Sequence, residues 1–157
     1  MSVAQDGETD RLAQWMGRAL DQARQAASQN EVPIGAVIVL NGVVIGAGFN
    51  QTISQCDPTA HAEIVAIRAA ATHIENHRLV DAELFVTIEP CTMCAGALVQ
   101  SRIKRVIFGA AEPKAGAVRS SARVLENPGL NHRVDVVSGI RAAQAAVLMA
   151  DFFKDRR

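Results

Sequence analysis

The chain has 157 residues, of which 49% are hydrophobic, and its 16 Lys and Arg balance its 16 Asp and Glu. This length predicts one compact domain over residues 1–157, and the apolar content excludes a wholly disordered chain. No apolar run reaches the roughly 18 residues that a membrane span needs, and the start, MSVAQDGETD, is unlike a secretory signal. An odd number of cysteines, three, favours a reduced cytoplasmic protein over a disulfide framework.

The neutral net charge hides an asymmetry along the chain. Residues 1–99 carry five Lys and Arg against eleven Asp and Glu, a balance of −6, and residues 100–157 carry the remaining eleven and five, a balance of +6. A basic part of this kind favours a polyanionic partner, although charges scattered over a solvated surface explain the same numbers.

Apolar periodicity predicts a helix followed by a hairpin in the first third of the chain. Apolar side chains recur at helical spacing over residues 10–28. The apolar run 33–40 predicts a buried strand, and Asn41-Gly42 predicts a two-residue turn because both residues tolerate positive φ. Residues 43–50 are then the expected antiparallel partner.

Helices and strands alternate through the rest of the chain. Thr59 is the expected cap of a helix that extends to about His73, and the final helix is expected to carry Ala142, Ala146, Met149 and Phe153 on one face. The other expected elements are a strand at 83–89, a helix at 92–100, a strand at 104–110, a loop at 111–129 and a short strand within 133–139. This order predicts an α/β fold with three α-β-α layers and a mixed five-stranded sheet.

Two of the three cysteines lie close together in TIEPCTMCAGAL, directly after Pro90. Cys91 and Cys94, at positions i and i+3, share one side of a helix. The positive end of that helix lowers thiol pKa values and favours thiolate, the form that binds zinc. A single C-x-x-C also suits a redox pair or two unligated thiols, so this pattern alone leaves the chemistry open.

His61 is the candidate third ligand because it opens a helix that follows a strand and a loop, and Glu63 stands two residues later. Residues at i and i+2 do not share a helix flank, so both serve one site only if it lies over the helix end. Three protein ligands leave one position for water, and a nearby carboxylate then completes a hydrolytic arrangement. The plainer alternatives are an unligated histidine and a surface glutamate.

H-A-E followed by P-C-x-x-C is the known signature of zinc nucleoside and nucleobase deaminases. The chain further resembles the bacterial tRNA-specific adenosine deaminases from about residue 10 to its end, in EVPIGAVIV, GFN, DPTAHAEI, EPCTMCAGAL, SRIKRVIFGA, NPGLNHRV and DFFKDRR. The resemblance implies a cytidine-deaminase-like fold and one Zn²⁺ per subunit on His61, Cys91 and Cys94. It also implies hydrolytic deamination of adenosine to inosine by zinc-activated water, with Glu63 as the proton shuttle.

The implied substrate is the wobble position of a tRNA anticodon, and the implied assembly is a homodimer. By the same resemblance, Asn50 hydrogen-bonds the purine and the Ala62 backbone meets the base. Pro33 and Ile34 wall the pocket, although both also suit an ordinary core. Phe153 is the expected stacking surface for RNA, and its neighbours are three cations that suit phosphate: Lys154, Arg156 and Arg157.

One residue departs from the family pattern. Glu112 stands where relatives commonly carry aspartate, which puts an RNA contact of that loop in doubt, and Cys56 is expected to be a bystander. Two rival functions stay open. A deaminase of free cytosine, guanine or nucleosides would use the same four residues, and a structural-zinc or RNA-binding module would need a fourth protein ligand.

Overall fold

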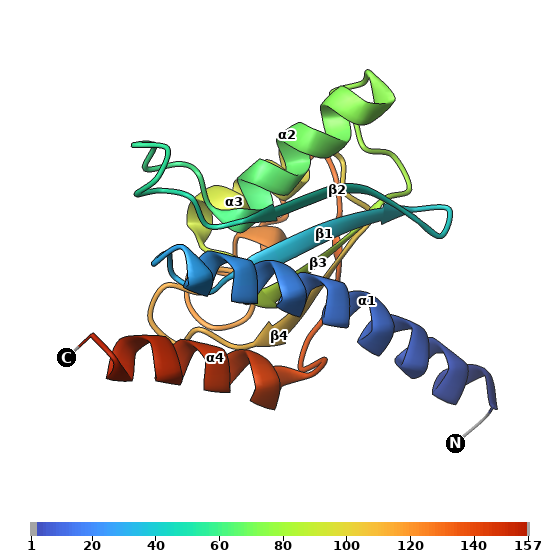
Figure 1. Ribbon diagram of the computed structural model, residues 1–157. Coiled ribbons are helices and arrows are strands. Elements are labelled where there is room, and N and C mark those ends of the chain that lie inside the picture. Colours follow the sequence, from blue (N-terminus) through green and yellow to red (C-terminus); the bar gives the residue numbers. More distant parts are fainter. Residues whose placement is uncertain (1–2, 157) are drawn as a thin grey trace.

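A mixed five-stranded sheet runs through the computed structural model, which describes residues 3–156 (Figure 1). The strand order is β2-β1-β3-β4-β5; β1 pairs antiparallel with β2 and β3, and β3, β4 and β5 are parallel. The strands are β1 (Gly35–Leu40), β2 (Val43–Phe49), β3 (Glu83–Ile88), β4 (Arg105–Ala110) and β5 (Asp135–Val137). The predicted mixed five-stranded sheet is therefore confirmed.

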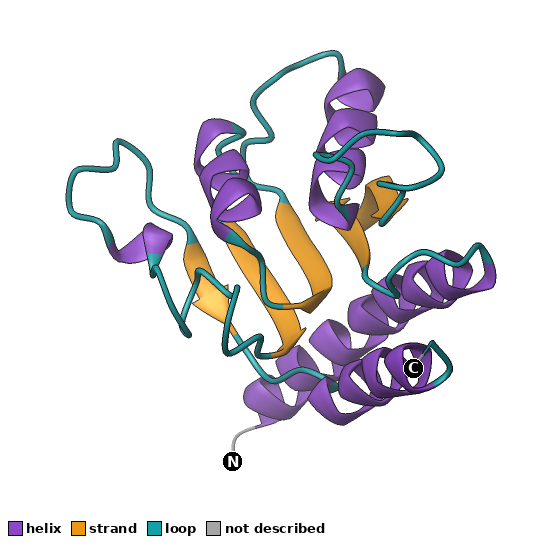
Figure 2. Ribbon diagram, turned by 90° about the vertical axis from the view of Figure 1, so that its left-hand side faces the viewer, coloured by secondary structure: helices purple, strands orange, loops and turns teal. Residues whose placement is uncertain are grey.

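Four α-helices cover the sheet, two on each face (Figure 2). One pair is α1 (Val3–Ser28) and α4 (Ala142–Lys154), and the other is α2 (Ala62–Ile74) and α3 (Thr92–Gln100). A short 3₁₀ turn, η1 (Val124–Glu126), contacts α3. Within residues 3–156, no helix is both long and apolar enough to cross a membrane.

The sheet buries both faces, which explains the continuous apolar runs of its central strands. In β1, Ala36 and Ile38 pack toward α2 and α3, whereas Val37 and Val39 pack toward α1 and α4. The same alternation continues in β3, where the fully buried Phe85 joins the α1 side. A strand that is buried on both faces does not alternate apolar and polar residues. The length of the run 33–40 and its Val and Ile content therefore predicted this strand, and alternation did not.

Helix α2 begins later than its sequence predicts. Its N-cap is His61, not Thr59. The Asp57 carboxylate accepts hydrogen bonds from the Thr59 backbone N–H at 2.8 Å and from the Thr59 hydroxyl at 2.6 Å. This local turn occupies the Thr59 side chain, so the helix starts where the turn ends.

Helix α4 buries other residues than the four that were expected to share one face. Ala145 and Phe152 are buried, whereas Ala146 and Phe153 are exposed. Most positions of this helix carry Ala or a larger apolar residue, so the apolar pattern does not select one face. Packing against α1, β3 and β4 selects it instead.

Close packing of α2 on β2 depends on Gly48. An ideal Cβ there would lie 2.7 Å from both the Ala62 carbonyl oxygen and the Ala66 backbone nitrogen. We expect Gly48→Ala to lower the free energy of unfolding by about 1–3 kcal/mol in urea titrations, because it pushes α2 off the sheet. Gly7→Ala is the control: Gly7 is exposed on α1 with nothing near its Cβ position, so it should be neutral or stabilising. Equal losses in both variants would contradict this account.

Candidate active site

Two helix N-termini meet at one edge of the sheet. Both β2 and β3 are antiparallel to β1, which lies between them, so their carboxyl ends share an edge. Helix α2 follows β2 through a loop, and α3 follows β3 almost directly. His61 is the N-cap of α2, Cys91 is the N-cap of α3, and Cys94 lies in the first turn of α3. The two helices therefore follow strands that are not adjacent in the sheet but are separated by β1.

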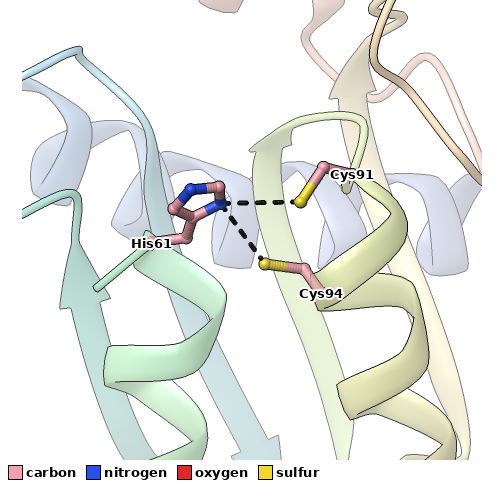
Figure 3. A group of neighbouring side chains, drawn as sticks. All are labelled: His61, Cys91 and Cys94. Carbon is pink, nitrogen blue, oxygen red and sulfur yellow. Dashed lines mark hydrogen bonds between the residues drawn. The ribbon is translucent and has the colours of Figure 1, made fainter. Parts of the chain in front are cut away.

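His61, Cys91 and Cys94 point toward one another (Figure 3). The His61 Nδ1 atom lies 3.6 Å from the Sγ atom of Cys91 and 3.6 Å from that of Cys94. Zn–N and Zn–S bonds of about 2.0–2.3 Å in a tetrahedron place ligand atoms roughly 3.3–3.8 Å apart. The donor set and its spacing thus fit zinc with one position left for solvent. In the described part of the chain this group has three members, and Cys56 is exposed and outside it.

The two thiols differ sharply in acidity. The pKa of Cys91 falls to about 3 because the Cys94 thiol and His61 hydrogen-bond its thiolate. The Cys91 thiolate and burial together raise the pKa of Cys94. The first thiolate therefore forms readily, whereas the second forms only when a cation compensates its charge, which is how zinc binding displaces protons from such sites.

Glu63 lies in the first turn of α2 and is 4% exposed. Burial raises its pKa to about 7, and the negative charge of Cys91 adds to this effect. A carboxyl group that titrates near neutral pH can both accept and donate a proton, which is the property that a general acid–base requires.

A cavity of about 160 Å³ opens beside these side chains. Of the predicted substrate-binding residues, Ile34 and Asn50 line this cavity. The other three, Pro33, Ala62 and Phe153, do not. Pro33 is buried next to Ile34, and Phe153 lies on the exposed face of α4. The lining residues are Ile34, Asn50, His61, Glu63, Ile88, Glu89, Cys91, Glu112, Ala115 and Met149.

Comparison with known proteins identifies the family. The family model for MafB19-like deaminases matches residues 11–157. The tRNA-specific adenosine deaminase of Haemophilus influenzae is 46% identical over 143 residues, covering 90% of this chain and 83% of the relative. That of Agrobacterium fabrum is also 46% identical, covering 91% and 94%. The chain belongs to the tRNA-specific adenosine deaminase family.

Solved structures place the deaminase among the same enzymes. One solved structure comes from studies of A-to-I editing by tRNA:A34 deaminases at the wobble position, and it is 47% identical to this chain with a TM-score of 0.84. The match covers 86% of this chain and 98% of the chain in that structure. A guanine deaminase from Bacillus subtilis is 31% identical, with a TM-score of 0.63 and coverage of 78% and 81%. The cytidine-deaminase-like fold expected from the sequence is thereby confirmed.

Asn50 links the end of β2 to the start of α2 in this deaminase. Its side-chain Oδ1 accepts the Ala62 backbone N–H at 2.8 Å, which satisfies one of the unpaired amides of the helix start. That bond fixes the carboxamide, so the amide nitrogen is the group left to donate to a ligand. The Ala62 N–H already has a partner, so the contact predicted between it and a base would share this hydrogen.

Some C-terminal residues of the deaminase are held by contacts with the rest of the chain, and others are exposed. Phe152 is buried, and the Arg156 guanidinium lies 3.5 Å from its ring centroid and donates to Asn30 Oδ1 at 2.8 Å. Phe153 and Lys154 are exposed, and Arg157 lies outside the described residues. Phe153, and not Phe152, is therefore the aromatic residue available for stacking.

Glu89 is a site residue that the sequence analysis missed. Its carboxylate is 4% exposed and accepts hydrogen bonds from several groups of one loop. The donors are the backbone N–H groups of Glu112, Val118, Arg119 and Ser120 and the hydroxyl of Ser120. The anchored loop supplies Glu112 and Ala115 to the cavity wall. An acidic residue ending a buried apolar strand, as in ELFVTIE, was a signal for such a role because an unpartnered buried carboxylate is costly.

The acid stability of the deaminase should depend on Glu89. Burial raises its pKa, but the hydrogen bonds from Ser120 and the loop amides outweigh burial and bring it down to about 2, from an ordinary 4.5. Because the folded-state pKa is the lower one, the stabilisation is complete above about pH 4.5 and is lost as the pH falls toward 2. Glu89→Gln should lower the free energy of unfolding at pH 7 by about 3 kcal/mol and flatten its decline between pH 5 and 2.

Denaturant titrations across that pH range test this expectation. The matched control is Glu126→Gln, because Glu126 is an exposed carboxylate on η1. An acid transition that is identical in the wild type and Glu89→Gln would show that the loop does not depend on this carboxylate.

Proposed function

We propose that the chain is a zinc-dependent tRNA adenosine deaminase that converts adenosine to inosine at the wobble position of a tRNA anticodon. The observation that carries the proposal is the convergence of His61, Cys91 and Cys94 beside the buried Glu63 at the wall of one cavity. Its support includes relatives named tRNA-specific adenosine deaminases and a similar structure studied for editing of A34.

His61, Cys91 and Cys94 would hold the zinc, which when bound lowers the pKa of water in the open position. Glu63 accepts a proton from the attacking water, which adds to C6 of adenine. Glu63 delivers this proton to the ring nitrogen, then takes the second proton from the hydroxyl now on C6 and passes it to the departing amine, so adenosine and water give inosine and ammonia. A carboxyl whose pKa lies at about 7 is suited to both halves of this exchange.

The cavity selects one base at a time. Its volume of about 160 Å³ is below the roughly 300–1,000 Å³ of pockets that enclose larger ligands. The Asn50 amide nitrogen donates to an acceptor of the purine, Ile34 and Met149 flank the ring, and Pro33 supports Ile34. The base must leave its stack to enter, which costs least in a single-stranded loop.

Contacts outside the cavity would offset part of that cost. Met149 lines both the cavity and a neighbouring surface hollow on α4, which also includes Phe153 and Lys154. An exposed aromatic ring beside a cation suits base stacking together with a phosphate contact. We therefore assign this face of α4 to the anticodon loop.

We infer a homodimer from the hollow between α2 and α3. Its volume is about 560 Å³, its lining includes Ile64, Ile67, Met93, Gly96 and Ala97, and Met93 is 36% exposed. Apolar surface of this kind marks interaction sites. Met93→Glu should shift sedimentation from dimer to monomer at micromolar concentration, and a wild type that is already monomeric would contradict the inference. The free thiols that the metal site needs suit the reducing cytoplasm.

The similarity to a guanine deaminase keeps a second candidate, deamination of free bases or nucleosides. The discriminating experiment compares turnover of an anticodon stem-loop with that of free adenosine, cytidine and guanine. We expect inosine in the stem-loop and little reaction of the free compounds. Turnover of the free compounds alone would overturn the tRNA assignment.

A further inference from the structure

A second cavity lies at the opposite edge of the sheet from the cysteines. Its volume is about 340 Å³, and it is formed by the connection between α2 and β3, the connection between α3 and β4, and residues just before and at the start of β5. We name it the basic cavity. Its lining residues are Arg78, Val80, Asp81, Arg102, Lys104, His132, Arg133 and Asp135. None of them lines the candidate active site.

Unpaired positive charge gathers in the basic cavity. Four of its lining residues are Arg or Lys and two are Asp, yet among residues 3–156 none of these four cations forms an ion pair. Arg11, Arg24 and Arg105 elsewhere all pair with carboxylates. Like charges around one hollow repel one another unless an anion compensates them. The cavity therefore suits an anionic ligand.

Backbone carbonyls hold two of these cationic side chains and the neighbouring His132 in place without neutralising the cations. Arg102 donates to the Val99 carbonyl oxygen at 2.7 Å, and Arg133 donates to that of Asn127 at 3.3 Å. The His132 Nε2 atom donates to the Ile103 carbonyl oxygen at 2.7 Å, since a carbonyl can only accept. The remaining guanidinium N–H groups stay free for a ligand. Side chains already held in this way lose less entropy on binding.

The chemistry of the lining points to phosphate. Guanidinium groups bind phosphate with paired hydrogen bonds, and lysine adds a compact charge. Val80 is 57% exposed at the rim and provides an apolar surface for the organic part of a ligand. The volume lies within the range of small-molecule sites. Arg102, Lys104 and Arg133 belong to residues 100–157, so part of the +6 charge excess lies here and not at the active site.

We propose that the basic cavity is a second binding site, remote from the catalytic one, for a phosphate group carried by a free nucleotide or by the RNA backbone. The proposal requires neither zinc nor catalysis.

Binding is tested in the Glu63→Ala background, which keeps it independent of turnover. Calorimetry measures Kd for inorganic phosphate, 5′-AMP, an anticodon stem-loop and full-length tRNA. The test variant is Arg78→Ala/Lys104→Ala, because in the described structure the hydrogen bonds of these two residues come from their backbone and neither side chain forms an ion pair. The control is Arg18→Ala/Arg24→Ala, which removes the same charge from exposed positions of α1. Thermal melts confirm that both variants fold.

At least one probe should bind the test variant about tenfold more weakly than the wild type and the control. Weaker binding of phosphate and 5′-AMP alone assigns the cavity to free nucleotides. A loss confined to RNA, with a raised KM and an unchanged kcat in the active background, assigns it to the RNA backbone. Equal Kd values in the test variant and the control, or no binding of any probe to the wild type at millimolar concentration, would overturn the proposal.

Discussion

Replacing Glu63 by glutamine should lower kcat for inosine formation by about 10²–10⁴-fold. Glutamine keeps the volume of the buried side chain but can neither take a proton from water nor protonate the ring nitrogen or the leaving amine. Affinity for the stem-loop should change by less than about threefold, since Glu63 lies inside the cavity and can contact only the one base that enters it, whereas the other proposed RNA contacts lie outside. Zinc content should stay at one per subunit, because the proposed ligands are His61, Cys91 and Cys94. Steady-state inosine assays, filter binding and elemental analysis provide the three measurements.

The control lies on the same helix. Glu75→Gln changes an exposed carboxylate at the C-cap of α2, far from the cysteines along the chain, and should leave kcat unchanged. Full activity of Glu63→Gln would show that this carboxylate is not the proton shuttle, and RNA binding without inosine formation by the wild type would favour the rival reading in which the zinc is structural. Loss of both zinc and stability in Glu63→Gln would show that this carboxylate supports the metal site and not proton transfer.

Removing one metal ligand should abolish activity and lower stability together. Cys91→Ser is the informative change, because serine is a favourable N-cap and α3 keeps its start, whereas its hydroxyl is a poor zinc ligand. Bound zinc should fall to near zero. A ligand present at 1,000 times its Kd stabilises a fold by about 4 kcal/mol, so the wild type should lose stability of that order in strong chelator. The Cys91→Ser variant should already lack the stability that zinc supplies, so its stability should change little in chelator.

Elemental analysis and thermal melts with and without chelator provide the measurements. Cys56→Ser is the control, since Cys56 is exposed and outside the ligand group, and it should retain zinc and activity. Zinc affinity should also fall with decreasing pH, because the hydrogen bond to the Cys91 thiolate and burial raise the pKa of Cys94 and a proton then competes with the metal. Zinc binding that survives in Cys91→Ser but is lost in Cys56→Ser would refute the proposed ligand set.

Local patterns predicted most of the fold because its elements carry strong signals. The run 33–40, Asn41-Gly42 and the run 43–50 became β1, a turn and β2, as expected for an apolar hairpin. The errors came where the pattern was degenerate or a side chain intervened. Most positions of α4 are apolar and offered no single face, and the Asp57–Thr59 turn moved the start of α2 to His61.

The sequence alone was sufficient to select the candidate ligands and their neighbouring acid. Cysteines at i and i+3 and a histidine two residues before a glutamate, each at a helix start, restrict the chemistry because donor types and helical spacing are local properties. The family resemblance then supplied the substrate class.

Only the tertiary structure decided how these pieces meet. The placement of β1 between two parallel strands brings the tips of α2 and α3 together, and Glu89 binds a loop that begins 23 residues later. The basic cavity likewise gathers four cations from three separate connections, those that lead into β3, β4 and β5. Such contacts join residues that are distant in the chain, and no local spacing encodes them, because they depend on strand order and on which buried carboxylates find donors.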